Sequence, residues 1–230
     1  MGDILKITLI SDTHTRHNKL NHLLPGGDVL IHAGDVTSVG NFTETLDFIK
    51  WFDKIDNYDK KIFIAGNHDY LFQQRPDQTL EMILDHESVT YLQDSQTFLG
   101  VENNIKTWGT PWQPEFKSWA FNLKRRSKEI KEKWAQIPKD TQLLITHGPP
   151  FGRLDWVTKS YENVGSLELA RRIEIIKPKI HVFGHVHEGY GYTHDGYTHY
   201  INASMVSHQD MNNNPINIIW DVDKNEVKFL

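Results

Sequence analysis

The sequence predicts an α/β fold in which two β-sheets pack face to face and helices cover their outer sides. Two patterns lead to this prediction. Strand-like apolar runs alternate with helical stretches over most of the chain, and four strand-like runs follow one another over roughly the last fifty residues. Of the 230 residues, 38% are hydrophobic, which suffices for a substantial core in one domain over residues 1–230.

Five apolar runs predict the central strands, because short apolar runs bounded by turn residues are typical of buried strands. They cover residues 5–10, 28–33, 61–65, 142–146 and 179–183. Shorter strands are expected at 89–92 and 105–108. The final runs are expected to pair antiparallel, and they cover residues 190–192, 198–201, 217–220 and 227–229.

Four stretches predict helices, which cover residues 41–55, 78–84, 122–134 and 166–176. Asn41 or Thr43 is the expected cap of the first helix, and Ser166 of the last. The third helix is strongly charged, which is typical of a solvated helix face; a rim that attracts anions is the alternative.

The composition excludes several kinds of chemistry. The chain has no cysteine, so disulfides, thiolate zinc sites and cysteine nucleophiles are excluded, and any metal must bind to His, Asp, Glu or Asn. The formal net charge of −5 argues against nucleic acid as the main partner, because such binding relies on a basic face. No apolar run approaches the ~20 residues of a membrane span, and the first residues lack the pattern of a signal peptide. We therefore expect a cytoplasmic protein without a membrane partner.

Polar residues of one chemical kind follow the five central strands, where each strand ends. They are Asp12, His14, Asp35, Asn67, His68, His147, His185 and His187. In α/β sheets, functional sites gather beyond the carboxyl ends of the strands, so we expect these side chains to converge on one small volume. Each alone is explained as a turn residue or cap, but five such endings flanked by Gly, Pro or Ser indicate a shared site.

The residue types predict a site for two divalent metal ions. Carboxylate, imidazole and amide ligands without a thiolate suit manganese, iron or zinc. Two ions about 3.5–4 Å apart need a bridging carboxylate. Asp35 is the natural bridge, since it stands alone after its strand and Gly34 leaves room beside it. Mn²⁺ is the first candidate, with Fe or Zn as alternatives.

Five motifs, in this order along the chain, resemble the signature of the calcineurin-like metallophosphoesterases. They are Asp12-Thr13-His14, Gly34-Asp35, Gly66-Asn67-His68-Asp69, His147 and Gly184-His185-Val186-His187. Within that superfamily, the chain is most similar to the branch of metallophosphoesterase-domain-containing brain proteins and their bacterial relatives. That similarity includes Trp108-Gly109-Thr110-Pro111-Trp112 and Asn202-Ala203-Ser204. The resemblance implies a two-sheet α/β sandwich with a dinuclear phosphoesterase site.

The resemblance also implies a role for each site residue. The first metal would bind to Asp12, His14, Asp35 and His187, and the second to Asp35, Asn67, His147 and His185. His68 would not be a ligand: it would protonate the leaving group or contact a phosphoryl oxygen. Asp69 would orient His68, as a carboxylate often does for an imidazole. Asn67 and His68 would also contact the substrate.

The implied reaction is hydrolysis of a small phosphoester by a metal-bridging hydroxide. The segment after Asp35 reads Val36-Thr37-Ser38. It lacks the arginine with which protein phosphatases of the superfamily grip phosphate. This departure favours a phosphodiester substrate, including nucleotides and cyclic nucleotides, over a monoester. Open alternatives are a phosphomonoesterase, a nuclease, and a nucleotide- or metal-binding regulatory protein with little turnover.

The segment 108–121 carries five aromatic residues. We expect most of them to pack onto the domain, with Trp112 as the one that stacks on a nucleobase. Of the remaining histidines, His32 and His181 lie inside expected strands and are assigned to the core. His17, His22 and His208 are expected to be exposed.

Overall fold

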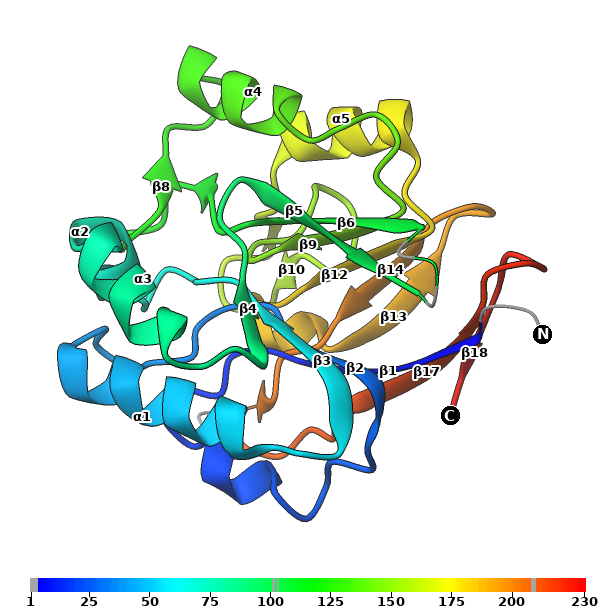
Figure 1. Cartoon of the computed structure of the whole chain (residues 1–230). Coiled ribbons are helices and arrows are strands. Elements are labelled where there is room, and N and C mark those ends of the chain that lie inside the picture. Colours follow the sequence, from blue (N-terminus) through cyan, green and yellow to red (C-terminus); the bar gives the residue numbers. More distant parts are fainter. Residues whose placement is uncertain (1–3, 101, 103, 208–209) are drawn as a thin grey trace.

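Two six-stranded sheets form the centre of the protein in the computed structural model, which describes residues 4–100, 102, 104–207 and 210–230 (Figure 1). In each sheet four neighbouring strands are parallel. The other two strands are antiparallel to their neighbours: both lie at one edge of the first sheet, and one lies at each edge of the second. Helices lie on the outer sides of both sheets. This architecture confirms the predicted α/β class with two packed sheets.

The strands of each sheet lie in an order that differs from their order along the chain. Across the first sheet they are β18 (Glu226–Phe229), β17 (Ile216–Asp221), β1 (Ile4–Ile10), β2 (Gly27–His32), β3 (Tyr58–Phe63) and β4 (Val89–Tyr91). Across the second they are β13 (Gly191–His194), β14 (His199–Asn202), β12 (Ile180–Phe183), β9 (Leu143–Thr146), β6 (Ile105–Thr110) and β5 (Ser95–Leu99). Short pairs outside the sheets are β7 (Gln113–Pro114) with β8 (Asn122–Leu123), β10 (Trp156–Val157) with β11 (Glu162–Asn163), and β15 (Val206–Ser207) with β16 (Asp210–Met211).

The helices are short and come between strands in the order of the sequence. They are α1 (Phe42–Lys54), α2 (Tyr70–Gln74), α3 (Pro76–Leu84), α4 (Lys128–Ala135) and α5 (Leu167–Ile176), with single 3₁₀ turns η1 (His17–Leu20) and η2 (His187–Gly189). In the part of the chain that the structure describes, none of the helices has the length and the apolar surface that a membrane crossing needs.

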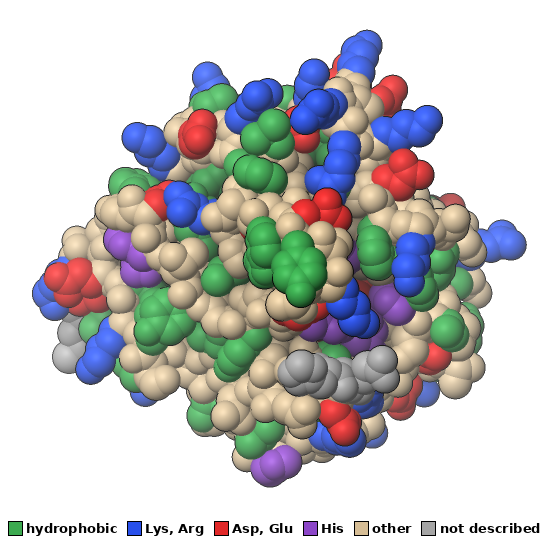
Figure 2. Space-filling model, turned by 180° about the vertical axis from the view of Figure 1, so that it is seen from behind, with side chains coloured by type: hydrophobic (Ala, Val, Ile, Leu, Met, Phe, Trp, Pro, Cys, Tyr) green, Lys and Arg blue, Asp and Glu red, His purple; other side chains and the backbone are tan. Residues whose placement is uncertain are grey.

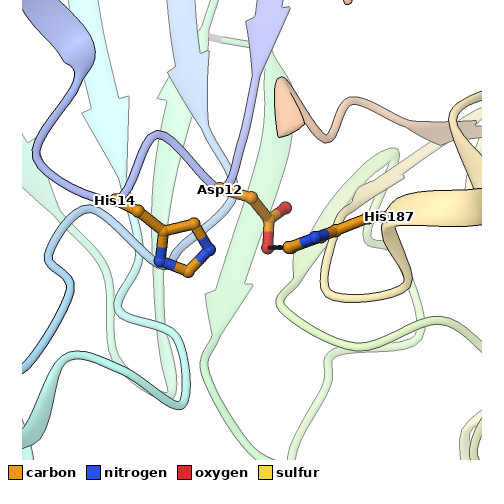
Figure 3. A group of neighbouring side chains, drawn as sticks. All are labelled: Asp12, His14 and His187. Atoms are coloured by element: carbon orange, nitrogen blue, oxygen red, sulfur yellow. Dashed lines mark ion pairs between the residues drawn. The ribbon is translucent and has the colours of Figure 1, made fainter. Parts of the chain in front are cut away.

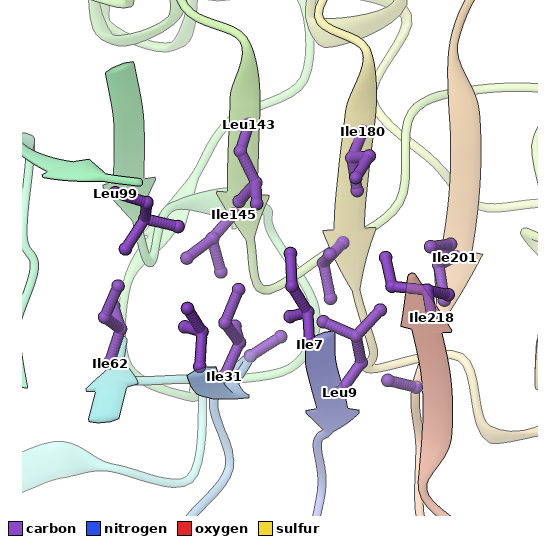
Figure 4. Close-up of a cluster of buried hydrophobic side chains, with 14 of the residues drawn as sticks. Ile7, Leu9, Ile31, Ile62, Leu99, Leu143, Ile145, Ile180, Ile201 and Ile218 are labelled. Carbon is purple, nitrogen blue, oxygen red and sulfur yellow. The ribbon is translucent and has the colours of Figure 1, made fainter. Parts of the chain in front are cut away.

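Apolar side chains between the two sheets form the main core (Figure 4). Side chains alternate between the two faces of a strand, so Ile7 and Leu9 of β1 both point towards the second sheet. There they meet Ile145 of β9 and Ile180 of β12 in one buried cluster. The apolar runs of the sequence therefore supply both layers of this core.

Helices bury the outer face of each sheet. Phe48 and Phe52 of α1 pack on the first sheet, while Trp134 of α4 and Leu169 of α5 pack on the second. Figure 1 shows α1 on one side of the two sheets and α4 with α5 on the other. This packing holds both sheets with their strand ends at a common edge.

Most predicted elements are present, with a few shifts. Asn41 and Ser166 cap their helices as expected. The charged helix begins only at Lys128, after the cap Ser127, because Asn122 is engaged in the short pairing with β7. The four strands predicted near the end of the sequence correspond to β13, β14, β17 and β18. They form two antiparallel hairpins, but the hairpins join different sheets.

Removal of the Phe48 side chain is expected to destabilise the fold by about 3–5 kcal/mol, because it would leave a cavity under α1. This ring is fully buried and lies 5.1–5.3 Å, between ring centroids, from those of His32, Phe52 and Phe63. Urea denaturation of Phe48→Ala measures the loss. Phe42→Ala on the same helix is the control: its side chain is 47% exposed, so a change within about 0.5 kcal/mol is expected. Equal losses in the two variants would contradict this account of the core.

Candidate metal centre

The expected site residues lie in loops that follow β1, β2, β3, β9 and β12. The loops after β1 and β2 are joined by hydrogen bonds from Asp12 N to Gly34 O (2.9 Å) and from His14 N to Asp35 O (3.1 Å). Asp12, His14, Asp35 and His185 all have positive φ, between 43° and 65°. This conformation is uncommon for residues with a side chain. It turns the backbone sharply where each strand ends and directs the side chains into the space between the loops.

Two glycines let these loops approach each other closely. A Cβ atom on Gly184 would collide with the Asp12 carboxylate and the Ser11 hydroxyl, and one on Gly66 would collide with Asp35. Both positions therefore require glycine, because the backbone itself lies against an acidic side chain of the site.

One group of side chains consists of Asp12, His14 and His187, which we call the Asp12 group (Figure 3). The possible ligand atoms of the three all lie within 4.8 Å of one another. His187 Nε2 is 3.4 Å from Asp12 Oδ1. Figure 3 shows the Asp12 carboxylate between the two imidazoles, which come from loops far apart in the sequence.

A second group consists of Asp35, His147 and His185, which we call the His147 group, and its possible ligand atoms also lie within 4.8 Å of one another. His147 Nε2 is 3.4 Å from Asp35 Oδ1 and 3.0 Å from Asn67 Oδ1. The other oxygen of Asp35, Oδ2, is 3.8 Å from His14 Nε2. Asp35 thus faces both groups, one oxygen to each, so its carboxylate can bridge two metal ions.

Backbone carbonyls fix the orientation of three imidazoles. The Nδ1–H groups of His14, His68 and His147 donate to the carbonyls of Thr37 (3.2 Å), Ser38 (2.6 Å) and Ala33 (3.0 Å). Because a carbonyl can only accept, Nδ1 carries a proton in each ring, and in the neutral ring the lone pair lies on Nε2. Such hydrogen bonds set the tautomer and ring orientation of metal-binding histidines.

Burial and mutual charges shift the pKa values of the site. Burial alone would raise the pKa of Asp35, but the charge and hydrogen bond of His147 hold it well below its usual range. Burial would likewise raise the pKa of Asp12, and His187 outweighs it and lowers that pKa. Burial lowers the pKa of His185 to about 3. Burial would likewise lower the pKa of His147, but the charge and hydrogen bond of Asp35 outweigh it and raise that pKa to about 9. The site therefore offers two ionised carboxylates and the neutral imidazole of His185, and a metal ion would displace a proton from His147.

The donor set fits a pair of divalent metal ions. Seven of the predicted residues contribute to it: two carboxylates, four imidazoles and the amide oxygen of Asn67. Such oxygen and nitrogen donors suit manganese, iron or zinc. The two groups meet at Asp35, so two ions can be held side by side with this carboxylate between them.

His68 lies beside both Asp35 and His14. Its backbone N–H donates to Asp35 Oδ1 (2.8 Å), and its ring centroid is 4.6 Å from that of His14. The ring packs on Trp119, with centroids 3.9 Å apart and planes at 32°. Its possible ligand atom also lies within 4.8 Å of those of His14 and Asp35, so distance alone permits either a ligand role or an acid role.

Asp69 is placed differently from the expectation that it orients His68. Its carboxylate accepts hydrogen bonds from the backbone N–H groups of Gly66 (2.7 Å), Val36 (3.2 Å) and Thr37 (2.8 Å), and from the Thr37 hydroxyl (2.6 Å). Burial, followed by the charge of Asp35, raises the pKa of Asp69 to about 6. Asp69 therefore fastens the loop after β2 to the loop after β3.

Trp112 is also placed differently from its expected stacking role. Its Nε1–H donates to Asp94 Oδ2 (2.9 Å), and the Lys133 ammonium lies 4.5 Å from its ring centroid. Two other aromatic residues of the same segment lie at the site instead. Trp119 packs on His68, and Phe116, which is 46% exposed, lies with its ring centroid 5.6 Å from that of His185. The sequence shows the aromatic segment but not which of its residues face the site.

The remaining histidines largely follow the expectations. His32 and His181 are buried, and their Nε2 atoms lie 2.9 and 2.8 Å from the hydroxyls of Thr13 and Thr146. His22 is exposed. His17, in contrast, is fully buried. It packs on Trp51 and lies 3.2 Å from Asp47. His208 lies outside the described residues.

A cavity of about 650 Å³ opens beside the Asp12 group, and His187 lines it together with Lys159, Glu188 and Tyr190. Figure 2 shows histidine side chains near the middle of one face of the molecule, next to hydrophobic and basic side chains. One residue of the Asp12 group, His187, therefore lies on a cavity large enough for a small ligand.

Comparisons with known proteins agree with this geometry. The sequence profile of the family described as calcineurin-like phosphoesterase matches residues 5–189. Human metallophosphoesterase domain-containing protein 1 is 40% identical over 233 residues, covering 92% of this chain and 68% of the human protein.

Two solved structures share the fold. The Thermus thermophilus protein TT1561 has a TM-score of 0.66 at 15% identity, over 99% of this chain and 98% of that one. The 5'-nucleotidase from Candida albicans has a TM-score of 0.56 at 13% identity, over 98% of this chain and 51% of that one. The profile match covers most of the length and the human relative is 40% identical. The chain belongs to the calcineurin-like phosphoesterase family.

Proposed function

We propose that this protein is a dinuclear metal-dependent phosphodiesterase that acts on small phosphodiesters, including cyclic nucleotides. The observation that carries the proposal is the position of Asp35, whose two oxygens face the Asp12 group and the His147 group separately. Mn²⁺ is the proposed metal, with Fe or Zn as alternatives, because the donors are oxygen and imidazole nitrogen.

Each group would hold one ion. Asp12, His14 and His187 would bind the first, and Asn67, His147 and His185 the second, with Asp35 on both. When bound, the two ions would supply a water of lowered pKa as the nucleophile and positive charge for the phosphoryl oxygens.

His68 is the proposed general acid. Its Nδ1–H is donated to Ser38 O, so in the protonated ring Nε2 carries the proton that would pass to the leaving oxygen. The packing of the ring on Trp119 limits its rotation. A ring held in one orientation loses less entropy when it meets the substrate.

The residues after Asp35 support a diester over a monoester. Thr37 and Ser38 use their carbonyls to orient His14 and His68, and neither brings a positive charge to the phosphate. A phosphodiester carries one negative charge and a monoester up to two, so a diester needs fewer cationic contacts.

The exposed ring of Phe116 beside His185 offers a surface on which a nucleobase can stack.

The test compares bis(p-nitrophenyl) phosphate with p-nitrophenyl phosphate, using the manganese-loaded protein. We expect kcat/KM for the diester to exceed that for the monoester by at least about tenfold, which corresponds to ~1.4 kcal/mol of transition-state stabilisation. The two substrates share a leaving group, so the ratio reports the charge of the phosphoryl group. Faster hydrolysis of the monoester would contradict the diester assignment, and no hydrolysis of either would favour a regulatory role.

A further inference from the structure

We infer that Asn202 is a positioning residue of the metal centre, which holds the turn that carries His187 against the segment that carries Asp12. Asn202 is the last residue of β14 and is fully buried. It belongs to the motif Asn202-Ala203-Ser204, which has no role in the chemistry proposed above. The inference rests on the proposed dinuclear site.

One end of the Asn202 amide binds the turn between the two histidines that follow β12. Asn202 Nδ2 donates to the carbonyl of Val186 at 2.8 Å. This carbonyl belongs to the peptide that leads directly into His187, so its direction sets the position of the His187 backbone. The Gly189 N–H donates to the same carbonyl at 2.9 Å. Gly189 also leaves room beside this contact, because a Cβ there would lie 2.0 Å from Leu154 O and 2.9 Å from Asn202 Nδ2.

The other end of the amide binds the strand extension that reaches Asp12. Asn202 Oδ1 accepts a hydrogen bond from Ser204 N at 3.1 Å. Ser204 forms a parallel bridge with Ser11, and Met205 N donates to Ser11 O at 2.9 Å. Ser11 directly precedes Asp12. The buried amide therefore ties the turn before His187 to the segment 202–205, and the backbone of that segment is in turn joined to Ser11, the residue before Asp12.

The turn around His185 has supports that do not involve Asn202. Gly184 N donates to His147 O at 2.9 Å, and His185 N lies 3.1 Å from both oxygens of Asp12. Loss of the Asn202 amide should therefore displace His187 more than His185. The ion of the Asp12 group should weaken, and the ion of the His147 group should remain.

The test is calorimetric titration of the metal-free protein with Mn²⁺. For Asn202→Ala we expect one of the two binding steps to weaken by about 10–100-fold, the usual loss when a residue that orients metal ligands is removed. The other step should stay close to that of the wild type. Electron paramagnetic resonance of the loaded variant, at metal levels that fill the tighter step, should show isolated Mn²⁺ in place of a coupled pair.

Thr198→Val is the matched control. Thr198 is buried at the other end of the same strands, and its hydroxyl donates to Pro178 O at 2.7 Å. Like Asn202→Ala, this variant loses one buried hydrogen bond to a backbone carbonyl, here between the segments that precede β14 and β12. It should nevertheless bind both ions normally. Asn202→Asp is the second variant. It retains an acceptor for Ser204 N while losing the donor to Val186 O, and it should show the same selective loss.

Two outcomes overturn the inference. One is that both Asn202 variants bind both ions as the wild type does. The other is that Thr198→Val weakens metal binding as much as they do, which would reduce the role of Asn202 to general stability. A wild-type protein that binds fewer than two ions would instead refute the proposed dinuclear site, so the two failures are distinguishable.

Discussion

Asp35→Asn is expected to lower phosphodiester hydrolysis by at least ~10³-fold and to reduce the metal content from two ions to one or none. The two oxygens of Asp35 face His147 and His14 separately. An amide offers one oxygen and no charge, so it holds two cations far more weakly than the carboxylate does. The ions provide several kcal/mol of transition-state stabilisation, and each 1.36 kcal/mol corresponds to a tenfold change in rate.

The measurement combines elemental analysis of the purified variant with its turnover of bis(p-nitrophenyl) phosphate. Asp195→Asn is the control, because Asp195 lies near the start of β14, at the end away from Asn202. There its carboxylate accepts hydrogen bonds from Thr198 N and the Tyr200 hydroxyl. It should retain two ions and nearly the full rate. If Asp35→Asn also kept two ions and the wild-type rate, Asp35 would not be the bridge.

His68→Ala is expected to slow hydrolysis by about 10²–10⁴-fold, the usual contribution of a general acid, while both ions stay bound. The loss should be larger for an alkyl leaving group than for p-nitrophenolate, because an alkoxide must be protonated as it leaves and p-nitrophenolate need not be. The ring is held for this task by Ser38 O and Trp119.

Metal analysis separates the two roles that the position of His68 permits. Its ring lies within ligand distance of His14 and Asp35, so a ligand role predicts loss of metal together with activity. Equal losses with both leaving groups would also argue against an acid. His86→Ala is the control, since His86 similarly donates Nδ1–H to a fixed acceptor, Asp53 (2.7 Å), outside the site. It should leave the rate unchanged.

The positions of the metal-binding candidates could be predicted from the sequence because they depend on local patterns. Each buried strand is a short apolar run, and each run ends at the residue where the polar side chain appears. The edge at which parallel strands end is common to all of them. Asp35 and His147 could therefore be expected to meet, although 112 residues separate them in the sequence and 3.4 Å separates their side-chain atoms.

The contacts of the aromatic segment could not be predicted, because they depend on how the loop folds back. The short pairing of β7 with β8 returns the chain across the site and brings Trp119 onto His68. The same fold leaves Trp112 against Asp94 and Lys133. Sequence spacing alone does not distinguish these two tryptophans, since both lie in one irregular loop.

The contact partners of buried polar residues could not be predicted from the sequence either. Asp69 follows His68 directly, which suggests a contact between the two, yet its oxygens satisfy backbone N–H groups of two neighbouring loops. The sequence predicts an exposed His17, but Trp51 of α1 covers it. In both cases the partners come from segments at least thirty residues away or from backbone atoms, neither of which leaves a pattern in the sequence.

Anomalous scattering from crystals of the manganese-loaded protein tests the central claim most directly. We expect two peaks about 3.5–4 Å apart. One should contact Asp12, His14 and His187, the other Asn67, His147 and His185, and Asp35 should contact both. A single peak bound by both His185 and His187 would contradict the dinuclear centre and the mechanism built on it.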